Sequence, residues 1–179
     1  MTITINNEIC VISPTDWITD GQTGKQYLVV DLAGDLVYDD NKQACHDLGG
    51  FLPEPRDERE NQFLDSLCTD MFQLGLTDRD VEGQWVWDSD GSLVTWESWI
   101  WNEPDGGLNE NCMVMARTWQ TSKAGHRSEG WIDVLCQSEL EYYTNFPKNL
   151  ICQRNPGEFR DCALGKFSFL NTHFRAAKR

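Results

Sequence analysis

The sequence lacks several features that would place it in large classes of proteins. Its 179 residues contain no run of about 18 apolar residues of the kind a membrane-spanning helix needs, so we expect no membrane insertion. Basic residues are few: the net charge is -14, which disfavours nucleic acid as a partner because phosphates repel an acidic surface. There is also no Cys-x-x-Cys pair, which argues against a structural zinc site or a thioredoxin-type motif.

The seven cysteines instead favour disulfide bonds and an oxidising compartment. Their odd number leaves at least one thiol unpaired or bonded to another chain. The first seven residues lack the charged start and long apolar stretch of a signal peptide, and no Asn-x-Ser/Thr glycosylation site is present. We expect a secreted or extracellular protein whose signal peptide is not part of this sequence.

Two short helices are predicted in the first half of the chain. Residues 41–48 place apolar side chains on one face, and Asp40 or Asn41 is expected to cap this helix. Residues 57–67 predict a second helix with the same kind of amphipathic pattern. We expect the charge run of residues 56–60 to be the solvated first turn of that helix.

Strands are predicted at residues 26–30 and in the stretch after residue 70, where short apolar runs are broken by glycine turns. Trp85 and Trp87 alternate along one such strand, so both rings should share one face and belong to the core. Helices followed by short strands indicate an α+β domain. We expect three parts: an N-terminal extension over 1–24, the domain over 25–154, and a C-terminal tail over 155–179 that packs on the domain or contacts a partner chain.

Four acidic side chains gather in a stretch rich in turns and glycine that includes Cys112 and Cys136. They are Glu103, Asp105, Glu110 and Asp133. Calcium takes six to eight oxygen ligands and tolerates irregular geometry. A loop of carboxylates held by a disulfide therefore predicts a calcium site.

Several motifs occur in the order in which the C-type lectin-like domain family has them, and residues 25–154 resemble that family as a whole. The motifs are Leu74-Gly-Leu, Glu82-Gly-Gln-Trp-Val-Trp, Glu103-Pro-Asp, Glu110-Asn-Cys, Gly130-Trp-Ile-Asp, Cys136 and Leu150-Ile-Cys. Within the family, the run Pro-Asp-Gly-Gly before Glu-Asn-Cys is most similar to the loop of tetranectin-like members. The resemblance implies an α+β fold with two helices, short antiparallel strands and a long loop that binds calcium and is held by a disulfide.

The resemblance also implies how most of the cysteines pair. The family disulfides correspond to Cys45–Cys152 and Cys112–Cys136. Because the termini lie close together in this fold, we further expect Cys10 to pair with Cys162. Cys68 would then remain as a buried thiol or bond to another chain.

Calcium ligands follow from the same resemblance. One ion would be held by Glu103, Asp105, Glu110 and Asp133, with Pro104 in the cis form. A second ion would be held by Asp78, Glu82, Glu110, Asn111 and the carbonyl of Gly107. Some relatives carry one more acid just after the Glu-Pro-x triplet, where this chain has Gly106.

The number of hydrogen-bond donors among the predicted calcium ligands indicates how well a sugar would bind. Sugar-binding members use open calcium positions for two hydroxyls, each of which also exchanges hydrogen bonds with the calcium ligands. The four carboxylates of this loop only accept hydrogen bonds, and Ile132 stands where sugar binders usually have asparagine. We therefore expect firm calcium binding with weak or atypical monosaccharide binding. Trp101 and Leu108 beside the acids are further candidate ligand contacts.

The resemblance implies a non-enzymatic, calcium-dependent carbohydrate-recognition domain. The alternative is a calcium-stabilised domain of the same fold that binds a protein ligand. An enzyme is disfavoured because His46, His126 and His173 are scattered and belong to no catalytic motif. Oligomerisation stays open.

Overall fold

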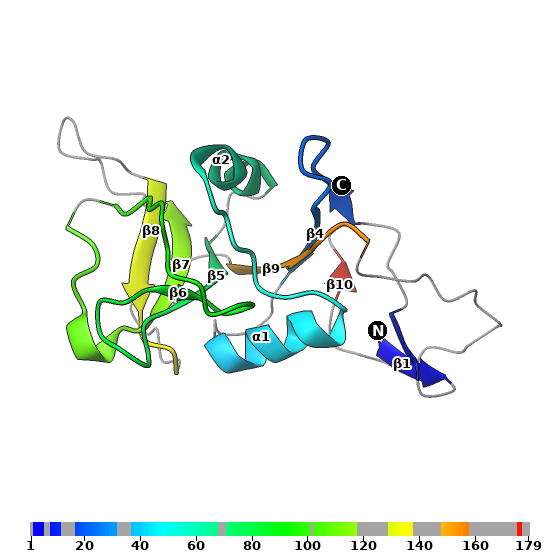
Figure 1. Ribbon diagram of the computed structural model, residues 1–179, viewed down its shortest axis with the longest axis horizontal. Helices are drawn as coiled ribbons and strands as arrows, with labels where there is room; N and C mark the ends of the chain where they lie inside the picture. Colours follow the sequence, from blue (N-terminus) through cyan, green and yellow to red (C-terminus); the bar gives the residue numbers. More distant parts are fainter. Residues whose placement is uncertain are drawn as a thin grey trace.

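The computed structural model is organised around one large, mostly antiparallel sheet with a helix on each side (Figure 1). It describes residues 2–5, 8–11, 17–31, 37–67, 71–100, 102–117, 129–137, 148–157 and 175–176. Within these residues the sheet has eight strands, and β1 and β2 form a separate hairpin. In this part of the chain no helix is long and apolar enough to cross a membrane.

The order of strands in the main path of the sheet is β10-β4-β9-β5-β7-β8, with β3 on β4 and β6 on β5. The strands are β1 (Thr2–Ile5), β2 (Glu8–Val11), β3 (Ile18–Thr19), β4 (Gln26–Asp31), β5 (Met71–Thr77), β6 (Val86–Trp87), β7 (Cys112–Arg117), β8 (Glu129–Val134), β9 (Lys148–Arg154) and β10 (Arg175–Ala176). The β5–β9 pair is parallel, whereas the other pairs are antiparallel. This order carries β8 to one edge of the sheet and β4 toward the other.

Helix α1 (Tyr38–Asp47) begins three residues earlier than predicted. The prediction that Asp40 or Asn41 caps it is wrong, because both lie inside the first turn and Val37 at the cap makes no side-chain hydrogen bond. Tertiary contacts set the start instead: the N–H of Tyr38 donates to the carbonyl of Cys136 at 3.1 Å. Asn41 is buried and its amide donates to the side chain of Gln73 at 3.0 Å.

Helix α2 (Glu58–Leu67) lies where it was predicted, but its first turn is not merely solvated. Asp57 accepts a hydrogen bond from the N–H of Glu60, and Glu60 accepts one from the N–H of Arg56, both at 2.8 Å. Asp57 thus caps the first turn by accepting from an N–H that has no partner within the helix, and Glu60 holds the residue before the cap. Glu60 is only 5% exposed, and the ammonium of Lys25 lies 2.7 Å from its carboxylate.

The sheet separates two hydrophobic cores, and Figure 1 shows α1 and α2 on its opposite sides. Alternate residues of one strand serve different cores: Leu28 of β4 packs with Cys45 of α1, whereas Tyr27 packs with Leu64 of α2. The core on the α2 side, here the tryptophan core, holds most of the indole rings. They are Trp85, Trp87 and Trp131, with Trp96 and Trp99 packed against them. The predicted core placement of Trp85 and Trp87 is thus confirmed.

Two disulfide bonds tie distant segments together. Cys45–Cys152 joins α1 to β9 across 107 residues, and Cys112–Cys136 joins the start of β7 to the end of β8. The side chain of Cys10, together with Cys68 and Cys162, lies outside the described residues, so their pairing stays a prediction. Two helices, this sheet and these disulfides make an α+β fold, as predicted.

Candidate calcium site

Strand β8 carries the most buried of the four loop acids. Asp133 pairs with Met113 of β7 and is only 4% exposed. Strand alternation places its side chain on the same face as Trp131, whereas Ile132 packs into the core on the α1 side. Asp133 therefore projects from a rigid strand, and Ile132 points away from it.

The segment that leads into the loop is attached to the same strand. The N–H of Trp131 donates to the carbonyl of Ser98 at 2.8 Å, and the N–H of Ile100 donates to the carbonyl of Trp131 at 3.0 Å. A Cβ at Gly130 would overlap the Ser98 carbonyl, so glycine allows this close approach. The chain thus enters the loop beside Asp133. Trp101, a candidate ligand contact, falls outside the described residues.

The loop over residues 102–111 has an irregular backbone. Asn102 adopts a positive φ of 73°, the Glu103–Pro104 bond is cis as predicted, and a short 3-10 helix, η1, spans Gly107–Asn109. A Cβ at Gly106 would overlap the side chain of Glu110. The extra acid that some relatives carry at position 106 therefore has no room here.

Three of the four predicted calcium ligands converge. Single carboxylate oxygens of Glu103, Asp105 and Asp133 all lie within 4.8 Å of one another. The two oxygens of Asp133 accept hydrogen bonds from the backbone N–H groups of Asp105 and Gly106, at 3.1 and 3.0 Å. These bonds dock the loop onto β8 at the point where the acids meet. Glu110 lies outside the group of three.

The crowding of carboxylates perturbs their titration. Burial, a hydrogen bond with Asp133 and the charges of Asp105, Asp133 and Glu110 together raise the pKa of Glu103 to about 8. Burial and the charges of Asp133 and Asp105 also raise the pKa of Glu110. The raised pKa favours the protonated form of Glu103. A divalent cation would stabilise the ionised form and displace that proton.

Asp78 marks the predicted second site. It follows β5, is only 2% exposed, and accepts a hydrogen bond from the N–H of Gly83 at 2.8 Å through one oxygen. Its other oxygen, Oδ1, is buried without a hydrogen-bond partner. Burial and the charge of Asp133 raise the pKa of this carboxyl. A buried carboxylate oxygen that lacks a donor fits a site completed by a cation.

The other predicted residues of the second site differ in their surroundings. Glu82 is exposed, and burial together with the charges of Asp78 and Asp133 raises its pKa. Asn111 donates its side-chain N–H to the carbonyl of Leu108 at 3.1 Å, and the Gly107 carbonyl accepts the N–H of Glu110. These two oxygen-bearing groups already take part in hydrogen bonds within the loop.

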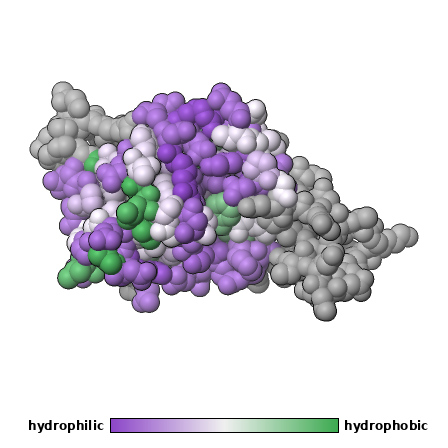
Figure 2. Space-filling view, in the orientation of Figure 1, coloured by the Kyte–Doolittle hydropathy of each residue, from purple (hydrophilic) through white to green (hydrophobic). Residues whose placement is uncertain are grey.

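Leu108 and Asn102 complete the surface around the acids. Leu108, at the tip of η1, is 80% exposed, and Figure 2 shows a small hydrophobic patch at the lower left, where η1 lies. Asn102 was missed by the sequence analysis: its amide Nδ2 lies 3.3 Å from a carboxylate oxygen of Asp105. Its position directly before the Glu103-Pro-Asp triplet is the sequence feature that indicates Asn102 as a site residue.

Comparisons with known proteins identify the family of this domain. A family model described as the lectin C-type domain matches residues 35–144. Tetranectin of Mus musculus is 32% identical over 119 residues, which cover 62% of this chain and 54% of that protein. The chain thus spans about half the length of tetranectin.

Two solved structures have the same fold. The cow C-type carbohydrate-recognition domain of CD23, in the presence of a GlcNAc2Man3 oligosaccharide, is 26% identical with a TM-score of 0.60 and covers 82% of this chain and 98% of that one. A Ca2+-dependent type II antifreeze protein in its Ca2+-free form is 25% identical with a TM-score of 0.60, over 79% and 99% of the two chains. The chain belongs to the C-type lectin domain family.

Proposed function

We propose that this domain is a non-enzymatic recognition module that binds calcium in the loop of residues 102–111 and a glycan through that ion. The main support for this proposal is the convergence of Glu103, Asp105 and Asp133, each of which has a carboxylate oxygen within 4.8 Å of the others. Three acids at this distance repel one another unless protons or a cation lie between them. Hard oxygen ligands in an irregular loop suit calcium better than a softer metal.

The ligands of the proposed ion differ in how firmly they are held. Asp133 comes from a buried strand position, whereas Glu103 and Asp105 come from the loop, and the backbone N–H of Asp105 is tied to Asp133. Glu110, which lies outside the group of three, would join by a movement of its side chain. Asp78, with its unpartnered oxygen, supports a second ion beside the first.

Glycan binding is supported by the relatives and by one amide of this chain. The CD23 domain was solved with an oligosaccharide. In this chain the four loop acids offer no hydrogen-bond donor, but the exposed amide of Asn102 lies 3.3 Å from Asp105 and supplies one beside the ion. A single amide donor at the edge of the site agrees with weak or atypical monosaccharide binding.

The second candidate function is binding of a protein ligand through the same calcium-ordered loop. Leu108 favours it, because a leucine that is 80% exposed at the tip of η1 provides an apolar contact that a polyhydroxylated ligand does not need. We also infer that the domain acts outside the cell, because its two disulfide bonds persist in oxidising compartments.

The testing experiment is a glycan array probed with calcium and, in parallel, with EDTA, together with calcium titrations followed by calorimetry. Calcium-dependent binding to a defined glycan class supports the leading function, and Asp105→Asn should abolish it. A blank array with a rise in melting temperature on adding calcium would leave the protein-ligand function, for which Leu108→Ser is the informative variant. If calcium neither binds nor stabilises the domain, both functions fail.

A further inference from the structure

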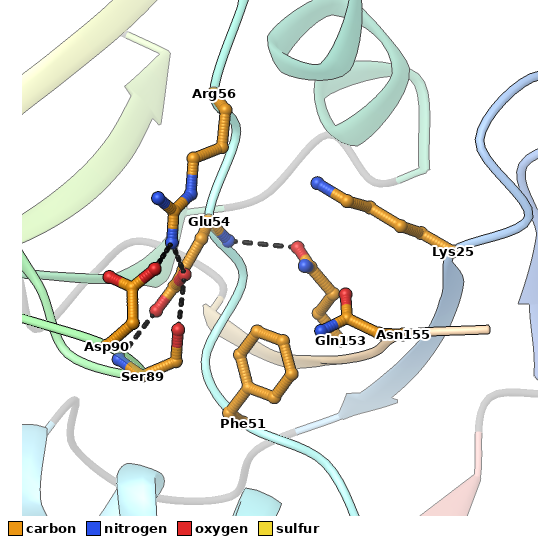
Figure 3. A pocket seen from close by; sticks show the side chains of 8 residues that line it. All are labelled: Lys25, Phe51, Glu54, Arg56, Ser89, Asp90, Gln153 and Asn155. Atoms are coloured by element: carbon orange, nitrogen blue, oxygen red, sulfur yellow. Dashed lines mark hydrogen bonds and ion pairs between the residues drawn. The ribbon is translucent and has the colours of Figure 1, made fainter. Parts of the chain in front are cut away.

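A cavity of about 490 Å³ lies apart from the calcium loop, between the segment that precedes α2, the start of β4 and the end of β9 (Figure 3). It is lined by Lys25, Phe51, Glu54, Arg56, Ser89, Asp90, Gln153 and Asn155. Its volume falls within the range of small-molecule sites in proteins. In Figure 1, β4 and β9 lie toward the opposite side of the domain from η1. No residue of the loop over 102–111 lines the cavity.

One wall is held rigidly by interlocking polar contacts. The guanidinium of Arg56 lies 2.8 Å from Glu54 and 3.0 Å from Asp90, and it lies over the ring of Trp87. Glu54 in turn accepts hydrogen bonds from the N–H and the hydroxyl of Ser89, at 2.9 and 2.8 Å. Because each group is fixed by its neighbours, this wall presents donors and acceptors in set positions.

Gln153 projects into the middle of the cavity. Its side chain is 2% exposed, and its Oε1 accepts a hydrogen bond from the N–H of Glu54 at 3.0 Å. Figure 3 shows this amide between Arg56 on one side and Lys25 on the other. With the oxygen engaged, the amide N–H groups are directed toward the cavity, where a ligand oxygen would accept from them.

The floor of the cavity is aromatic. The backbone of Phe51 pairs with that of Gln153 through two hydrogen bonds, of 2.8 and 2.7 Å, which hold this residue beside the end of β9. Its ring is partly exposed and faces the polar groups. An aromatic face beside planar amide and guanidinium groups suits a flat ligand with apolar C–H faces and polar edges.

The charges of the lining select against ions. It contains two cations, Lys25 and Arg56, and two carboxylates, Glu54 and Asp90. Both cations are already paired: Arg56 with these two acids and Lys25 with Glu60 at 2.7 Å. A charged ligand would have to displace an internal partner, whereas a neutral ligand with hydroxyl groups bonds to donors and acceptors without breaking these pairs.

We propose that this cavity is a second ligand site, which binds a neutral sugar residue without calcium. Hydroxyl groups that both donate and accept match the mixture of amides, guanidinium and carboxylates, and the ring of Phe51 packs against the C–H face of the sugar. The site stands independently of the calcium loop, because none of its lining residues belongs to residues 102–111 or to β8.

The test is a titration of the isotope-labelled full chain, followed by NMR, with methyl glycosides of glucose, mannose, galactose and N-acetylglucosamine in EDTA. Chelation removes the contribution of the loop. We expect saturable shifts of the side-chain amide signals of Gln153 and Asn155, with a dissociation constant on the order of 1–10 mM for at least one glycoside. Phe51→Ala should weaken this binding about tenfold, the loss expected from about 1.4 kcal/mol of packing.

Two further variants keep the result interpretable. Leu93→Ala, at an exposed leucine outside the lining, is the matched control and should bind within about twofold of the native chain. If Phe51→Ala strongly lowers the melting temperature, Asp90→Ala, at the exposed rim of the cavity, serves as the test variant in its place. It should also weaken glycoside binding. The proposal is overturned if no glycoside shifts these signals, if the shifts fall only on residues 102–111, or if sulfate or acetate occupies the cavity and the glycosides do not.

Discussion

Calcium affinity should depend steeply on pH because of the proton on Glu103. Without calcium, the pKa of this carboxyl is about 8, raised by burial and by the acids around it. Calcium binds the ionised form, so each pH unit below about 8 should weaken the apparent affinity roughly tenfold. Between about pH 8.5 and pH 6, the apparent dissociation constant should therefore rise on the order of 10²-fold.

The stability of the calcium-free domain should respond to pH in the opposite sense. The folded pKa of Glu103 lies above its ordinary value of 4.5, so the folded state binds more protons than the unfolded state between those two values. This contribution to stability is complete below about pH 4.5 and is lost as pH rises through about 8. The rise in melting temperature on adding saturating calcium should accordingly be larger at about pH 8.5 than at pH 6.

Isothermal titration calorimetry in buffers of different ionisation enthalpy measures both the affinity and the protons released. We expect about one proton released per calcium at pH 6.5, falling toward zero above pH 9. Glu103→Gln serves as the control: calcium should bind more weakly at high pH, and most of the proton release should disappear. A dissociation constant that changes less than about twofold from pH 6 to 8.5 would refute the assignment of the raised pKa to this site.

Three further predictions concern the loop and the disulfides. Gly106→Ala should lower the free energy of unfolding by about 1–3 kcal/mol in urea titrations, because its Cβ overlaps Glu110; an unchanged midpoint would contradict this. Asp133→Asn should weaken calcium binding at least about tenfold in calorimetry, since a charged ligand and one of two hydrogen-bond acceptors for the loop are altered; unaltered affinity would remove Asp133 from the site. Replacing Cys45 and Cys152 together by alanine should cost about 2–5 kcal/mol of stability, measured by thermal unfolding, whereas an unshifted melting temperature would make that bond dispensable.

Much of the fold could be predicted because its signals are local. The apolar pattern of residues 57–67 placed the second helix to within one residue, and the alternation of Trp85 and Trp87 placed both rings in one core. The start of α1 could not be predicted in this way. It depends on a hydrogen bond from Tyr38 to Cys136, nearly one hundred residues away in the chain.

The proximity of three loop acids could be predicted from the sequence, but their electrostatics could not. The order of the motifs named Glu103, Asp105 and Asp133 as neighbours, and the structure brings their oxygens together. The raised pKa of Glu103 depends on burial and on distances between charges that only the folded chain sets. The same holds for the burial of Glu60, which reads as a surface residue in sequence and instead pairs with Lys25.

The attachment of the loop to β8 has a consequence for how this domain can change over time. Trp131 and Asp133 lie on one face of the same strand, and the indole N–H of Trp131 donates to Asn61 of α2 at 2.8 Å. A slip of one residue in β8 would turn the indole out of its core and the acid away from the loop at once. Selection for a stable fold therefore also preserves the position of Asp133. Residues at the loop tip, such as Leu108, remain free to vary, so new specificities can arise without loss of the domain.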